Sequence, residues 1–158
     1  MNCFIVSFWP NKWTQKEFCK KTERHKKAKG RIFKEVKKDL DNTEAIAEMV
    51  HTFYAKVQKD DLIGPIFNGV IEDRWPQHLE KMVGFWETIL LNERKYFGSP
   101  FGKHAPLPIE KRHFERWLVL FNANLIDQFE GPLCEEAKKR AKQMALTFQY
   151  KLEHQRTQ

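Results

Sequence analysis

Residues 42–57 read NTEAIAEMVHTFYAKV and show the clearest helical pattern in the chain. Asn42 is a typical helix N-cap, and Glu44 suits the first turn, where an acidic side chain interacts favourably with the helix dipole. Apolar side chains then recur every three or four positions, at Ile46, Met49, Val50, Phe53, Tyr54 and Val57. The stretch therefore predicts an amphipathic helix with one buried face.

Three more amphipathic helices are predicted downstream. The second begins near Asp73, with Pro76 tolerated in its first turn, and has an apolar stripe from Leu79 to Leu90. The third runs from about Pro108 to Phe129, and the fourth from about Cys134 to Glu153. No segment has the pattern of a strand and no repeat is present, so the predicted fold class is all-α.

Glycine and proline mark the predicted breaks between these helices. Gly64-Pro65 is expected to end the first helix, because it cannot continue one. The stretch NERKYFGSPFGKHAPLP, residues 92–108, is predicted to be a loop that carries His104. His51 and His113 are expected at the surface or at a helix start, since neither lies squarely on an apolar stripe.

Composition limits the class of protein. The chain has 158 residues, the size of one domain, and is rich in aromatic residues, with 13 Phe, 5 Trp and 3 Tyr. Its three cysteines form no CxxC pair, which argues against a disulfide framework or a zinc site and favours a reducing, cytoplasmic environment. No apolar run approaches the ~18 residues of a membrane span.

The positive charge is concentrated at the N-terminus. Residues 1–42 hold 12 Lys/Arg and 5 Asp/Glu, whereas residues 43–158 hold 16 of each. We therefore predict a basic extension over residues 1–39 and a neutral domain over residues 40–158. The extension could tether the protein to nucleic acid or to an anionic membrane, but a solvated or partly helical segment without a partner is favoured.

The start of the chain also raises a hypothesis about translation. Val36 is followed by KKDLDNTEA, which would be an ordinary protein start. Val36 could be a misread initiation codon, with the preceding residues an artefact of gene annotation. A peptide containing Trp9 or Trp13 in the natively expressed protein would contradict this.

Four polar or amphipathic side chains could meet among the aromatic residues. Tyr54 and His78 share apolar stripes of their helices, Trp117 is central to the third helix, and His104 lies on its loop. Each has an ordinary structural explanation when taken alone: a surface or hydrogen-bonded histidine, a core tyrosine, a core tryptophan. Together they suggest a pocket with few polar groups and a generous aromatic lining, as a large flat apolar ligand requires.

The order of short motifs resembles one family. These are FYAKV (53–57), GPIFN (64–68), WPQH (75–78), KMVGFWETILL (81–91), YFGSPFGKH (96–104) and LPIEKRHFERWLVLF (107–121). Over about residues 40–153 the chain resembles the group III truncated haemoglobins, and nothing carries over to residues 1–39. The resemblance implies a globin-like sandwich of two helices on two around a haem.

The resemblance also implies roles for individual residues. His104 would be the proximal ligand of the iron of haem b, and the distal side would hold Tyr54, His78 and Trp117 as ligand-binding donors. Haem-lining residues would be Phe67, Met82, Phe85, Trp86 and Phe114, together with His104. Lys103, Arg112 and Tyr96 are candidates for the propionate groups, by proximity in sequence.

The implied function is a cytoplasmic haem protein, not an enzyme, that binds O2 reversibly, as in oxygen transport, and binds other diatomic ligands. The alternative is a haem-dependent redox enzyme, either peroxidase-like or a nitric oxide dioxygenase. It would need an external reductase, because the sequence contains no reductase domain. Distal polar groups serve either role, so the sequence leaves both open.

Overall fold

The computed structural model describes residues 37–156. Its helices are α2 (Thr43–Val57), α3 (Gly64–Ile71), α4 (Trp75–Leu90), α5 (Pro100–His104), α6 (Lys111–Gln128) and α7 (Pro132–Arg156). Residues 37–156 contain no strand, only an isolated bridge between Lys38 and Phe129. The all-α prediction is therefore confirmed. Most of the predicted extension and the Val36 hypothesis lie outside the described residues.

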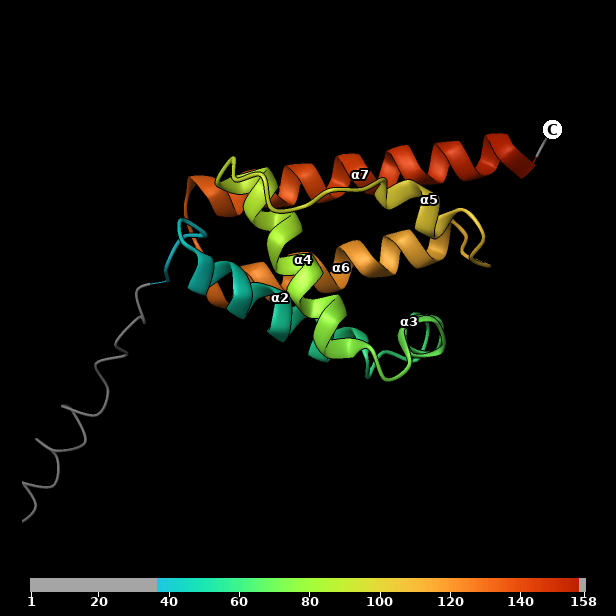
Figure 1. Ribbon diagram of the computed structural model, residues 1–158, viewed down its shortest axis with the longest axis horizontal. Helices are drawn as coiled ribbons and strands as arrows, with labels where there is room; N and C mark the ends of the chain where they lie inside the picture. Colours follow the sequence, from blue (N-terminus) through green and yellow to red (C-terminus); the bar gives the residue numbers. More distant parts are fainter. Residues whose placement is uncertain (1–36, 157–158) are drawn as a thin grey trace, which may run out of the picture. The chain divides into compact units, whose positions relative to one another are not determined.

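The helices form two layers of two. α2 packs against α4, and α6 packs against α7, to which it is joined by a short turn at residues 129–131. The layers meet through α2 on α6 and α4 on α7 (Figure 1). The predicted two-over-two sandwich is thus the observed architecture, with the short helices α3 and α5 at one end.

The first helix follows the prediction closely. Asn42 is its N-cap, in extended conformation, and its side-chain oxygen accepts a hydrogen bond from the Ala45 amide at 2.9 Å. Every apolar position predicted to face inward is buried. The N-cap and the helical spacing of apolar residues are sufficient to predict α2, because both signals indicate the same helix.

Two other boundaries differ from the prediction. Gly64-Pro65 does not end α2, which already ends at Val57. It begins α3, because proline at the first turn of a helix lacks only an N–H that would have no partner there. Gly64 suits this corner, since a Cβ would lie 3.0 Å from the Val57 carbonyl oxygen and would be tightly packed against it. The third helix begins at Lys111 rather than Pro108.

The start of α6 explains that second difference. Glu110 is the N-cap, and its amide donates to Nδ1 of His113 at 2.8 Å in a capping box. His113 is therefore a helix-start residue, as expected, but it is 8% exposed rather than on the surface.

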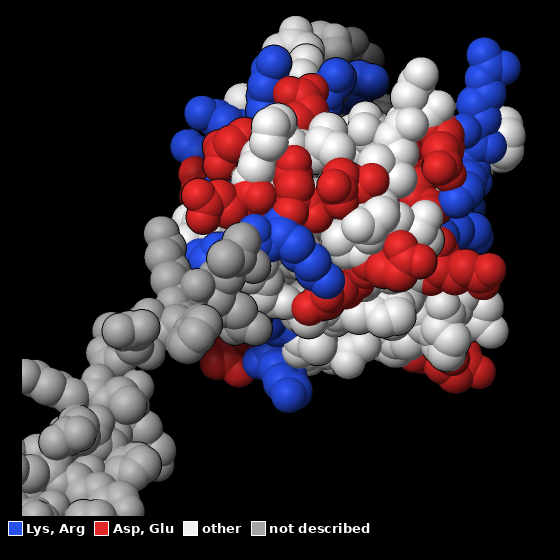
Figure 2. All heavy atoms as spheres, turned by 90° about the vertical axis from the view of Figure 1, so that its left-hand side faces the viewer, with Lys and Arg blue, Asp and Glu red and all other residues white. Residues whose placement is uncertain are grey.

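Charged residues of both signs cover the domain. Figure 2 shows the end where α2 and α7 begin, with Asp and Glu side chains across its middle and Lys and Arg side chains mostly around them. Among the described residues, no helix is long and apolar enough to cross a membrane.

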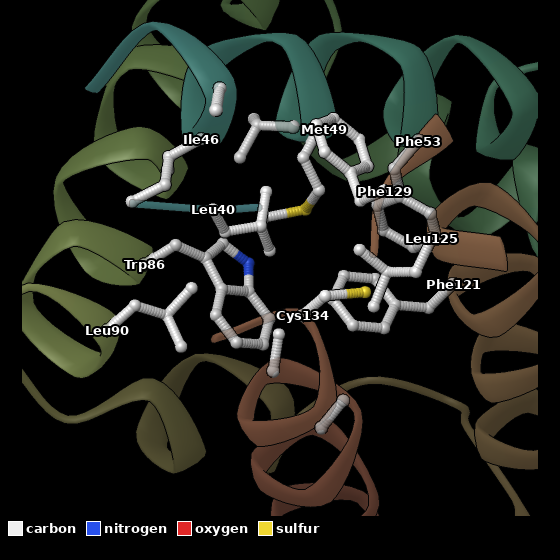
Figure 3. Close-up of a cluster of buried hydrophobic side chains, with 14 of the residues drawn as sticks. Leu40, Ile46, Met49, Phe53, Trp86, Leu90, Phe121, Leu125, Phe129 and Cys134 are labelled. Atoms are coloured by element: carbon white, nitrogen blue, oxygen red, sulfur yellow. The ribbon is translucent and has the colours of Figure 1, made fainter. Parts of the chain in front are cut away.

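The fully buried core follows one face of α2 along its length and includes the second halves of α4 and α6 and the first half of α7. Side chains of α2, α4, α6 and α7 meet there, and the indole of Trp86 extends from α4 into the cluster (Figure 3). Trp86 stacks on Phe121 at 5.0 Å between ring centroids, and Phe121 stacks on Trp117 at 5.1 Å. This aromatic stack joins the core to the first half of α6.

Candidate functional site

Burial changes along the long helices. On α6, Phe121 and Leu125 are fully buried, whereas Phe114 and Trp117, nearer its start, are half-buried. The same gradient runs along α4, from buried Trp86 to half-buried Met82. Half-buried aromatic and apolar side chains therefore lie on the first halves of α4 and α6, which are the halves nearer α3 and α5 (Figure 1). Their remaining surface is available to pack against an apolar group.

His104 is the last residue of α5. Its Nδ1 lies 2.7 Å from the carbonyl oxygen of Pro100, one helical turn earlier. A carbonyl can only accept, so Nδ1 carries the proton and the lone pair is on Nε2. The ring is half-buried and packs against Phe148 of α7, with centroids 5.1 Å apart. Both contacts fix the orientation of the imidazole.

Tyr54 and His78 face each other from α2 and α4. Their rings meet edge to face, with centroids 5.0 Å apart. Burial raises the pKa of Tyr54, so its phenol keeps its proton. Burial, and then the charges of Lys81 and His104, lower the pKa of His78 to about 4, so its ring is neutral at pH 7.

One ring nitrogen of His78 has a further property. Nε2 is the single buried side-chain polar atom without a hydrogen-bond partner among residues 37–156. Buried polar atoms are usually paired, so an exception in a half-buried aromatic setting suggests a partner other than the chain itself.

Trp117 completes the set of candidate donors. Its ring meets Phe53 edge to face at 5.3 Å, and Phe53 in turn meets Tyr54 at 4.9 Å. Tyr54, Trp117 and His78 are therefore connected through direct ring contacts. The contacts of His104 are different: its ring packs against Phe148 of α7 and its Nδ1 donates to the Pro100 carbonyl.

The predicted lining residues lie in different surroundings. Phe67 of α3 meets the ring of Tyr54 at 5.9 Å, and Phe85 of α4 meets Tyr96 at 5.1 Å. Trp86 lies deeper, in the buried core. Of the propionate candidates, Arg112 pairs with Glu110 at 3.3 Å and Lys103 is exposed. The roles of all these residues remain predictions.

Two groups near the site were missed from the sequence. Trp75 of α4 meets both Tyr54 and His78, at 6.1 and 5.7 Å between ring centroids. Asp60 lies in the turn between α2 and α3, where one carboxylate oxygen accepts from the Leu62 and Ile63 amides at 3.1 Å. An aspartate shortly before Gly-Pro is a signal for such a turn and could have identified it.

The ion pair of Asp60 joins three elements that carry candidate site residues. Its second carboxylate oxygen accepts from Nε of Arg116 at 2.7 Å, next to Trp117 on α6. Burial alone would raise the pKa of Asp60, but hydrogen bonds from Ile63, Arg116 and Leu62 lower it overall. The end of α2, the start of α3 and α6 are therefore held together at this point.

The residues present fit a haem. The lone pair on Nε2 of His104 suits an iron atom, and the half-buried side chains of Phe67, Met82, Phe85 and Phe114 suit a flat apolar ring. The unpaired Nε2 of His78 suits a hydrogen bond to a small ligand.

Comparisons with known proteins agree with this set of residues. Residues 38–150 match the family described as bacterial-like globin. The chain is 38% identical over 112 residues to a group 3 truncated hemoglobin from Campylobacter jejuni, covering 68% of this chain and 88% of the relative. The crystal structure of a group III truncated hemoglobin from the same organism matches with a TM-score of 0.69 and 37% identity. That match covers 74% of this chain and 95% of the other.

Proposed function

This chain belongs to the group III truncated haemoglobins of the bacterial-like globin family, and from that premise we propose that it binds haem b through His104 and holds O2 reversibly. Its fold makes it a globin-type haem protein, and globins bind diatomic gases such as O2. Tyr54, His78 and Trp117 would contact the bound gas, O2 or another diatomic ligand.

The geometry of His104 is the observation that carries the proposal. The hydrogen bond from Nδ1 to the Pro100 carbonyl fixes the tautomer that leaves Nε2 able to bind a metal. A partner on the second nitrogen is the usual arrangement of metal-binding histidines, because it also fixes the plane of the ring. Phe148 supports that plane from α7.

When bound, the haem supplies an iron that takes a diatomic gas as a ligand. The chain would contribute hydrogen-bond donors to the bound gas. The phenol of Tyr54 and the indole N–H of Trp117 can donate to negative charge on the gas, and neutral His78 can donate or accept according to its tautomer. Phe53, which contacts both Tyr54 and Trp117, fixes their relative position.

The haem itself would be held mainly by apolar contact. Phe67, Met82, Phe85 and Phe114 would pack against it. Burial of such aromatic side chains contributes roughly 1.5–3 kcal/mol each. The fully buried core gives these side chains a rigid support.

Absorption spectroscopy of the purified protein tests the proposal. We expect a strong Soret band, a ferric-to-ferrous shift on reduction, and further shifts on adding O2 or CO that reverse when the gas is removed. A chain that stays colourless in the presence of hemin would contradict haem binding. A haem-loaded chain whose spectrum does not respond to O2 or CO would contradict gas binding.

A further inference from the structure

A groove of about 680 Å³ lies along α4 and is bordered by His51 of α2 and by Lys95. Its wall is apolar and includes Trp75, Leu79 and Val83. Its rim is polar and includes His51 of α2, Glu80 and Lys95. None of the sequence-predicted site residues lines it, so it is a separate feature of the surface.

The groove and the candidate haem site lie on neighbouring faces of the same helix. Trp75, Leu79 and Val83 are spaced four residues apart and share one face of α4. His78 and Met82 are each one position earlier than Leu79 and Val83, on the adjacent face. The residues of the groove and those of the candidate haem site therefore lie on adjacent faces of α4.

Trp75 lies next to both the groove and the distal donors. Its indole lines the groove and also meets the rings of His78 and Tyr54 edge to face. At the start of α4 this side chain therefore connects the groove with the distal donors. A half-buried side chain near a helix end can move without disturbing the core.

We propose that this groove is an entry site for apolar diatomic gases and that Trp75 is the gate between it and the distal donors. The inference rests on the proposed function. A neutral gas molecule leaves water favourably for the apolar wall of Trp75, Leu79 and Val83. The charged rim has no part in binding a neutral gas. Its lysine, Lys95, forms ion pairs with Glu87 at 2.9 Å and with Glu93 at 2.6 Å.

An entry site has a kinetic signature that differs from that of a positioning residue. The same barrier is crossed on the way in and on the way out, so a change in the groove alters both rate constants by the same factor. The dissociation constant is their ratio and stays unchanged. A substitution that instead disturbed Tyr54 or His78 would change mainly the dissociation rate.

Flash photolysis and stopped-flow measurements with CO on the haem-loaded protein test the proposal. Leu79→Trp narrows the groove and should lower the association and dissociation rate constants together, by about threefold or more, with no change in affinity. Trp75→Phe keeps an aromatic contact with the donors but makes the gate smaller, and should raise both rate constants. Val119→Trp adds the same ring to a 56% exposed valine of α6 outside the groove, and should change neither.

The possible outcomes separate the two proposals. Unchanged rate constants in Leu79→Trp and Trp75→Phe would overturn the entry site while leaving gas binding intact. A change in the dissociation rate alone would also overturn it and would make these residues positioning residues. A wild-type chain that takes up no haem or no CO would overturn the proposed function first, and this inference with it.

A second readout does not depend on ligand kinetics. In the haem-loaded, CO-bound protein, xenon under pressure should shift the NMR signals of the Leu79 and Val83 methyl groups and of the Trp75 indole. Leu79→Trp should abolish these shifts, and Leu79→Phe serves if the larger ring prevents folding. The absence of xenon shifts in the wild-type protein would contradict an apolar gas site in the groove.

Discussion

Tyr54 is the candidate donor whose protonation state is fixed most firmly by its surroundings. Burial raises its pKa, so the phenol is present as O–H throughout the physiological range. Tyr54→Phe keeps the ring contacts and removes only this donor. Loss of a hydrogen bond to a charged acceptor costs about 1.5–3 kcal/mol, so O2 dissociation should be about tenfold to a hundredfold faster.

Stopped-flow measurement of O2 dissociation checks this, with Tyr150→Phe as the matched control. Tyr150 is 69% exposed on α7, and its variant should dissociate O2 at the wild-type rate. An unchanged rate in Tyr54→Phe would remove this hydroxyl from the proposed role. The contributions of donors in one network are not additive. Trp117→Phe and the double variant are therefore needed to separate the effects of Tyr54 and Trp117 on the O2 dissociation rate.

Asp60 links acid stability to the geometry near the site. Its folded-state pKa is lowered, so its carboxylate stabilises the fold above the ordinary aspartate pKa, and that stability is lost as pH falls through the lower folded value. Asp60→Asn should reduce the free energy of unfolding at pH 7 by about 1–3 kcal/mol, allowing for the exposed Arg116 partner. Its stability should also fall less than that of the wild type between neutral pH and acid.

Chemical denaturation at a series of pH values measures both effects. Asp61→Asn is the matched control, since Asp61 is exposed and adjacent in sequence. If Asp60→Asn and the wild type lost stability in parallel below pH 4, the ionised carboxylate would not be the stabilising group.

Residues of the candidate site differ in how readily they can be identified from the sequence. Tyr54 and His78 stand out by their positions on apolar stripes, and His104 by its place in a Gly/Pro-rich segment. The position of Asp60 before Gly-Pro indicates a turn, but its ion pair cannot be found in the sequence, because its partner Arg116 is 56 residues away and only the fold brings them together. Glu87 is a similar case: it reads as a polar residue in an apolar stretch, yet it is buried and accepts from Thr43 and Lys95.

At the scale of elements, α7 is anchored by a residue outside it. The carboxylate of Asp39 accepts hydrogen bonds from the Leu133 and Cys134 amides, at 3.0 and 2.8 Å, in the first turn of the helix. A Cβ on Gly131 would lie 2.4 Å from the Asp39 carboxyl carbon, and its φ of +142° also favours glycine. The segment before α2 thus closes the start of the last helix.

Asp39→Ala should remove this cap and lower the free energy of unfolding by about 1–2 kcal/mol. Asp41→Ala is the control, because the Asp41 carboxylate accepts only from the exposed Asn42 side chain. Thermal unfolding followed by circular dichroism compares the two. Equal losses in both variants would show that general charge, rather than the cap, is responsible.

Helix boundaries were predictable where local signals acted alone. Asn42 and the stripe that follows it set α2 without help from other elements. α3 was missed because an eight-residue helix is too short to show a periodic stripe, and its first residues read as a break. The start of α6 depends on the capping box between Glu110 and His113. The prediction placed the start at Pro108 because proline is common in the first turn of a helix.

At the scale of the whole molecule, the tightly packed core and the candidate binding residues occupy different parts of the sandwich. The core is filled by fully buried side chains of all four long helices, and the first halves of α4 and α6 carry half-buried rings. The stack of Trp86, Phe121 and Trp117 connects them. Substitutions in the core should therefore affect gas binding through Trp117 as well as through stability.

The domain from Lys37 onward should be independent of the basic residues before it. Residues 37–158 form a compact unit by themselves, and residues 43–158 carry balanced charge. A chain that begins at Lys37 should take up one haem and unfold at the same temperature as the full chain. Calorimetry on the two chains measures this, and a clearly lower unfolding temperature for the shorter chain would contradict it.

The central claim is that the imidazole of His104 binds the haem iron, and His104→Gly tests it most directly. Resonance Raman spectra of the ferrous haem-loaded protein should show an iron–histidine stretching band in the wild type. The variant should lose that band along with most of its haem, and added imidazole should restore both. A His104→Gly protein that keeps a full haem complement and the wild-type iron–histidine band without imidazole would contradict the account.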